Sequence, residues 1–148
     1  MATVIIDDHL LRDVLSGDRP PDLGGLATTV ATTGLWLFRL TSALAAPAIA
    51  GKLTAPVAAL SAQQQDRFRT LLVALPESIE VLHLRQLAWP MAQLQSRHRA
   101  GGRPLSAAMT EALGAAQALE AAIAVSNLDV GPNLKAAAEH DGVTFHVL

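Results

Sequence analysis

Short apolar runs alternate along this chain with longer segments of helical periodicity, and this alternation most constrains the fold. Apolar residues at successive positions, as in Val4-Ile5-Ile6, are typical of strands that are buried on both faces of a parallel sheet. We expect strands at residues 3–6, 27–32, 79–84, 122–126 and 143–148. Because strands alternate with helices, the sequence predicts a three-layer α/β/α domain with a central, mostly parallel sheet and the first strand in its interior.

Helices are expected between these strands, at residues 9–16, 33–45, 61–75, 86–99, 106–121 and 132–140. Ala and Leu, with 28 and 24 copies, are strong helix formers and supply most of the hydrophobic residues. Asp8 is the expected N-cap of the first helix, and Gly17 is expected to end it. Residues 17–25 are rich in Gly and Pro and predict a surface loop.

Length and charge narrow the class of protein. A chain of 148 residues is expected to form a single domain over residues 1–148. Its net charge of −2 does not favour nucleic-acid binding driven by the overall charge of the protein. Binding of a nucleic acid would instead need a local basic groove. The absence of Cys excludes a disulfide framework, thiol catalysis and Cys-ligated zinc.

No membrane segment is expected from the sequence. The longest uncharged stretch, residues 23–38, is shorter than the about 20 apolar residues that a membrane-spanning helix needs. Acidic residues at positions 7 and 8 interrupt the apolar region that a secretory signal would require. We therefore expect a cytoplasmic protein.

Acidic and small polar residues follow two of the predicted strands. Asp7 and Asp8 come after the first strand, and Ser126, Asn127 and Asp129 come at or after the strand near the C-terminus. Ligands of parallel sheets bind beyond the carboxyl ends of the strands, and carboxylate oxygens suit divalent metals. Glu111, on the edge of an Ala-rich helix, could reach the same end of the sheet. Each acid also has a plain structural interpretation, as an N-cap or a solvated helix residue.

The same segments resemble the PIN-domain family of metal-dependent ribonucleases, in particular its toxin–antitoxin members. The strand and Leu-rich helix of VIIDDHLLRDVL match the family's first motif. EALGAAQALEAAIAVSNLD matches a later motif, in which an acid opens an Ala-rich helix and a strand ends before a second acid. GPNLKAAAEHDGVTFHVL is similar to the closing segment of the family. The resemblance covers both ends of the chain and little of its middle.

The resemblance implies a catalytic site and a substrate. Asp7, Glu111 and Asp129 would be the catalytic residues and the ligands of Mg²⁺ or Mn²⁺, while Ser126 or Asn127 would orient metal-bound water. A cation would neutralise the repulsion among the carboxylates and lower the pKa of the bound water. The implied reaction is hydrolysis of RNA phosphodiesters, and the implied protein partner is an antitoxin-like protein.

The sequence departs from the family pattern in two ways. The family has a further acid in the helix after the second strand, but no acid lies between residues 23 and 65, and Arg39 stands near the expected position. Position 111 is Glu where the family usually has Asp. The acidic site is therefore incomplete unless Asp8 or Asp13 fills the gap. A PIN-like module without catalytic activity, which binds RNA or a protein, is the alternative function.

Three further hypotheses come from the residues. VIIDDHLLRDVL also resembles the start of a response-regulator receiver domain, but the acid that would be phosphorylated after the third strand is missing. The basic residues Arg85, Arg97, His98, Arg99 and Arg103 form either a solvated helix end or a rim that contacts phosphates. A homodimer is expected because the chain is small and unusually apolar.

Overall fold

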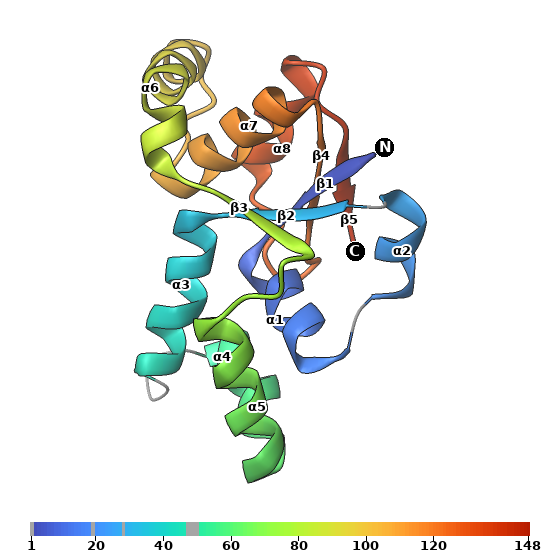
Figure 1. The fold of residues 1–148 in the computed structure, drawn as a ribbon. Helices are drawn as coiled ribbons and strands as arrows, with labels where there is room; N and C mark the ends of the chain where they lie inside the picture. Colours follow the sequence, from blue (N-terminus) through green and yellow to red (C-terminus); the bar gives the residue numbers. More distant parts are fainter. Residues whose placement is uncertain (1, 19, 28, 47–50) are drawn as a thin grey trace.

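The computed structural model describes residues 2–18, 20–27, 29–46 and 51–148. In this part of the chain five parallel strands form one sheet in the order β3-β2-β1-β4-β5 (Figure 1). The strands are β1 (Thr3–Ile6), β2 (Thr29–Thr33), β3 (Ile79–Leu82), β4 (Ala122–Val125) and β5 (Phe145–Val147). The predicted α/β/α fold is confirmed. The expected strand at 27–32 includes residue 28, which lies outside the described residues.

The central position of β1 was also predicted correctly. Val4 pairs with Val30 of β2 on one side and with Ala122 of β4 on the other.

The strand order also bears on the receiver-domain alternative. Receiver domains have the order 2-1-3-4-5, whereas β1 and β2 here lie between β3 and β4. The receiver interpretation is therefore wrong.

Six helices agree closely with the expected segments. They are α1 (Asp8–Ser16), α3 (Gly34–Ala45), α5 (Ala62–Val73), α6 (Leu84–Ala100), α7 (Ala107–Leu119) and α8 (Pro132–His140). Gly17 ends α1 in a left-handed conformation with φ of +85°, as expected. The expected N-cap of α1 is wrong, because Asp7 and not Asp8 accepts the hydrogen bond from the Leu10 N–H. Within the described ranges, no helix is both long enough and apolar enough to span a membrane.

Two short helices were not expected. Helix α2 (Pro21–Leu26) occupies part of the predicted loop, and the buried side chain of Leu23 anchors it to the core. Helix α4 (Gly51–Ala58) contains Pro56, which cannot donate a hydrogen bond to the carbonyl of Lys52 four residues earlier. That carbonyl instead accepts from Arg12 Nη1 at 3.2 Å. A long-range contact thus supports a helix that local sequence disfavours.

Buried side chains pack on both faces of the sheet. Ile5 of β1 faces the layer that contains α6, α7 and α8, whereas Val4 and Ile6 face the layer that contains α1, α3 and α5. This is the alternation expected of a strand, with both sides covered. Residues 110–116 of α7 are buried, and the Ala residues and Gly114 among them let α7 lie close to the sheet and to α6. The two layers leave the carboxyl ends of the strands to the loops that carry the acidic residues.

Candidate functional site

Asp7 lies at the carboxyl end of β1 and joins two elements. Its side chain is 2% exposed. Oδ1 accepts from the Leu10 N–H at 2.9 Å, and Oδ2 accepts from the Ser126 N–H at 3.0 Å, at the end of β4. Burial raises the pKa of Asp7 to about 7, although these two hydrogen bonds oppose the shift. Asp7 therefore ties α1 to β4 while carrying a carboxyl group that is reluctant to ionise.

Asp8 is buried beside Asp7 and faces a cation. Its Oδ1 accepts from the His9 N–H at 3.0 Å. Its Oδ2 accepts no hydrogen bond within the described ranges and lies 3.3 Å from Nε of Arg39. Burial raises the pKa of Asp8, and the positive charge of Arg39 opposes that shift. The guanidinium of Arg39 is thus the main electrostatic partner of this carboxylate.

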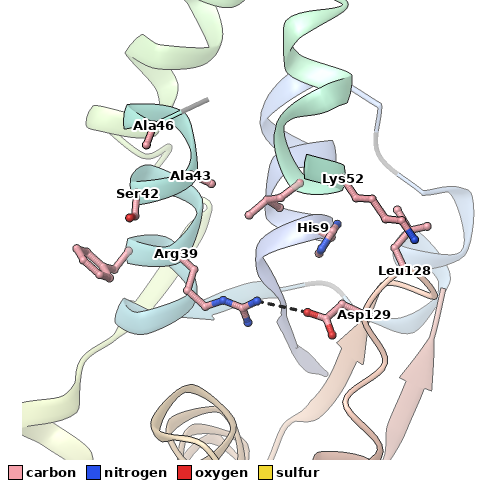
Figure 2. Close-up of a pocket in the computed structure, with 10 residues that line it drawn as sticks. His9, Arg39, Ser42, Ala43, Ala46, Lys52, Leu128 and Asp129 are labelled. Carbon is pink, nitrogen blue, oxygen red and sulfur yellow. Dashed lines mark hydrogen bonds and ion pairs between the residues drawn. The ribbon is translucent and has the colours of Figure 1, made fainter. Parts of the chain in front are cut away.

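Arg39 also contacts the acid that follows β4. Nη2 of Arg39 donates to Oδ2 of Asp129 at 3.3 Å (Figure 2). Both side chains are about half exposed, whereas Asp8 is buried. Helix α3, which carries Arg39, begins directly after β2, and β2 is the neighbour of β1 in the sheet. The fold therefore places one guanidinium between carboxylates that follow two different strands.

Glu111 lies on α7 and is fully buried. Its Oε1 accepts from the Leu35 N–H in the first turn of α3 at 2.8 Å. Its Oε2 has no hydrogen-bond partner in the described part of the protein. A carboxylate near the positive N-terminal end of a helix dipole is favourably placed. Glu111 is therefore not the solvated helix acid of the plain interpretation, since it caps α3 from a neighbouring helix.

The structure brings some of the predicted site residues together and leaves others apart. Asp7, Asp8, Arg39 and Asp129 line one small pocket, and Glu111 is not among its lining residues. A metal site of three or more His, Asp or Glu residues needs ligand atoms that lie close together. Among the described residues, one such group has its ligand atoms within 4.8 Å of one another, and it consists of His98, His140 and Asp141. Asp7, Glu111 and Asp129 do not form such a group. Their role as a metal site remains a prediction.

Ser126 and Asn127 have local roles. The Ser126 N–H donates to Asp7, and Oγ of Ser126 accepts from the Leu128 N–H at 3.2 Å. The backbone N–H of Asn127 donates to the carbonyl of Leu148 at 2.7 Å. These bonds fix the turn between β4 and Asp129. They assign no ligand to either side chain, so orientation of metal-bound water also remains a prediction.

Three of the five residues in the predicted basic set belong to one hydrogen-bonded network. Arg97 donates twice to the carboxylate of Asp141, and His98 and Gln117 also hydrogen-bond to it. Nε of Arg103 donates to Nδ1 of His98 at 2.9 Å. Asp141 follows α8, so these residues hold the ends of α6 and α8 together. The side chains of Arg97, His98 and Arg103 are therefore occupied by structural contacts, and Arg85 and Arg99 are exposed.

A larger pocket lies beside the acidic residues and was not expected. Its cavity volume is about 530 Å³, and it lies between α3 on one side and α1 and α4 on the other (Figure 2). His9, which follows the acid pair, points toward this space, and Lys52 of α4 lies next to it. Neither residue stands out in the sequence, because no metal-ligand or catalytic spacing links His9 to another polar residue. Only the position of His9 directly after Asp8 could have drawn attention to it.

Comparison with known proteins does not name a relative: no protein-family model matches this chain, and no curated protein matches it.

The contact between Glu111 and α3 leads to a stability prediction. Glu111→Leu should lower the free energy of unfolding by about 1–3 kcal/mol, because the Leu35 N–H would lose its acceptor in a buried setting. Glu111→Gln keeps an acceptor oxygen at the same position and should change stability less. Urea denaturation of the two variants and the wild type measures the difference. Equal losses for Leu and Gln would contradict a capping role.

Proposed function

We propose that this chain is a PIN-like domain that binds RNA without cleaving it, and that Arg39 takes the position of the divalent cation. The absence of cleavage rests on the contact of one guanidinium with Asp8 and Asp129, at 3.3 Å in each case, and RNA as the ligand rests on the resemblance to the PIN-domain family. Nuclease activity in the resembled family requires carboxylates that are free to hold a metal. Here two of the acids at the sheet end already face a positive charge that belongs to the protein.

Electrostatics supports this assignment. A unit positive charge about 5 Å from a bound cation costs about 3 kcal/mol per unit charge of that cation at an effective dielectric near 20. This corresponds to a loss of at least about a hundredfold in affinity. Both oxygens of Asp7 already accept hydrogen bonds, from the N–H groups of Leu10 and Ser126, and are therefore less able to bind a metal. The side chains as arranged do not fit a divalent metal, and we derive no reaction step through one.

The proposal predicts the result of a cleavage assay. Wild-type protein incubated with mixed-sequence single-stranded RNA and millimolar Mg²⁺ or Mn²⁺ should cleave no faster than Asp7→Ala. Thermal unfolding of the wild type should not shift on addition of Mn²⁺. Arg39→Glu removes the internal cation and adds a carboxylate, so its unfolding temperature should rise with Mn²⁺. Arg85→Glu, with the same charge change at an exposed position on α6, is the matched control and should not respond.

Wild-type cleavage that Asp7→Ala abolishes would overturn the proposal in favour of a metal-dependent ribonuclease. RNA binding is measured separately, by fluorescence anisotropy of a labelled single strand without added metal. Absence of RNA binding at micromolar protein would also contradict the proposal and would favour the protein-interaction alternative. The cleavage and binding assays therefore test the two halves of the proposal independently.

A further inference from the structure

The pocket between α3 and α4 combines an apolar wall with His9 and Lys52, and it shares the Arg39–Asp129 ion pair with the acidic site. Its wall includes Ala43, Ala46, Leu53 and Leu128. Phe38, which is 65% exposed, also lines it. A cavity of about 530 Å³ is within the range of pockets that enclose small organic ligands, and such pockets are mostly apolar with a few well-placed polar groups.

His9 offers a hydrogen-bond donor to this pocket. The residue is 5% exposed, and its ring points into the cavity (Figure 2). Nη1 of Arg12 lies 3.3 Å from Nδ1 of His9. Because a guanidinium can only donate, Nδ1 is the acceptor, and in the neutral ring Nε2 then carries the proton. Within the described ranges this Nε2–H has no hydrogen-bond partner, although the rest of the ring is almost entirely enclosed.

Among the described residues that line the pocket, Lys52 carries the positive charge that has no acidic partner. Its side chain is exposed and forms no ion pair with any described residue, whereas the charge of Arg39 is matched by Asp8 and Asp129. The backbone of Lys52 is held in place, since Arg12 Nη1 donates to the carbonyls of Lys52 and Leu53 at 3.2 Å each. Arg12 thus contacts both His9 and the first turn of α4. One buried arginine therefore holds the His9 ring and the backbone that carries Lys52 on the same side of the cavity.

We propose that this pocket binds a small organic anion, a carboxylate or a phosphate attached to an apolar body. The anionic group is held by His9 Nε2–H and the ammonium of Lys52, and the apolar body packs against Ala43, Leu53 and Leu128. This inference goes beyond the proposed function and does not depend on it, because the pocket would bind such an anion whether or not the neighbouring carboxylates hold a metal.

Isothermal titration calorimetry with three probes of equal chain length tests the proposal. Octanoate represents the carboxylates, octyl phosphate represents the phosphates, and octanol carries the same apolar chain without charge; all are kept below their micelle concentrations. At least one anion should bind about tenfold more tightly than octanol, as expected for charge-assisted hydrogen bonds in a partly apolar site. The anion that binds more tightly identifies the head group. Equal affinity for all three probes, or no binding of any, would overturn the proposal.

Two variants locate the ligand. Lys52→Gln should reduce the affinity for the preferred anion about tenfold and leave octanol unchanged, whereas Lys135→Gln, the other lysine of the chain, on α8, should change neither. Ala43→Phe fills the cavity and should weaken all three probes while the thermal unfolding temperature shows that the protein remains folded. Anion binding that persists unchanged in Lys52→Gln, or in a folded Ala43→Phe, would place the ligand elsewhere and refute the proposal.

Discussion

The free energy of unfolding should fall by on the order of 4 kcal/mol as pH rises from 4 to 7, because of Asp7. Burial raises the pKa of this carboxyl from 3.8 to about 7 in the folded protein. Between these two values the folded state keeps a proton that the unfolded chain has released, so unfolding is favoured progressively as pH rises. A difference of about three pKa units corresponds to about 4 kcal/mol. The pKa of Asp8 is also raised by burial, which acts in the same direction.

Asp7→Asn should remove most of this pH dependence. Asparagine keeps an oxygen that can accept from the Leu10 N–H, but its amide nitrogen cannot accept from the Ser126 N–H. The variant should therefore lose about 1 kcal/mol at acidic pH and be more stable than the wild type above pH 7. Urea denaturation at pH 4.5, 6 and 7.5 measures the effect, with Asp66→Asn at an exposed site on α5 as control. A wild-type stability that stays level over this range would contradict it.

The centre of the fold could be predicted from the sequence because local pattern and tertiary packing agree there. The apolar run Val4-Ile5-Ile6 fits a strand that is covered on both faces, and the Ala-rich segment of α7 fits a helix that is packed closely against the sheet. Helix α4 could not be predicted in the same way, since Pro56 disfavours it locally. Its freed carbonyl is satisfied by Arg12, a residue about forty positions away.

The candidate site shows the same limit. The sequence indicates that Arg39 stands near the position of an expected acid. That its guanidinium contacts both Asp8 and Asp129 depends on the angle at which α3 leaves β2. The burial of Glu111 also depends on packing between α7 and α3, because a carboxylate in a helix is ordinarily solvated. For the basic set the sequence allowed a phosphate-contacting rim, but the side chains of Arg97 and His98 instead contact Asp141, an acid that the sequence analysis did not single out.

Asp141 organises the other densely bonded cluster of the molecule and lies away from the candidate site. Its side chain is 4% exposed and accepts hydrogen bonds from Arg97, His98, His140 and Gln117. His98 is fully buried and accepts from Arg103 through Nδ1, so its Nε2–H donates to Asp141 at 2.9 Å. The cluster links α6, α7 and α8 through a single carboxylate. Loss of that carboxylate leaves a buried imidazole without its acceptor.

Asp141→Ala should therefore lower the free energy of unfolding by about 2–3 kcal/mol at neutral pH, because the buried Nε2–H of His98 loses its acceptor and charge-assisted hydrogen bonds are lost. Asp141→Asn keeps one acceptor oxygen and should lose less. Glu139→Ala, at an exposed position on α8, the helix that Asp141 follows, is the control and should change stability by less than about 0.5 kcal/mol. Equal stability of Asp141→Ala and the control would show that the cluster contributes nothing net to folding.

The pH dependence of this difference separates the charge of Asp141 from its packing. Burial raises the pKa of Asp141, but hydrogen bonds from Arg97, His98 and His140 more than reverse this and hold it well below its usual range. Its contribution to stability is therefore complete above about pH 4 and is lost as pH falls through the lower folded-state pKa. The gap between wild type and Asp141→Ala should narrow between pH 4 and pH 2, opposite in sign to the effect of Asp7 at higher pH. A gap that stays constant on acidification would mean that the carboxylate stabilises the helices by its shape and not by its charge.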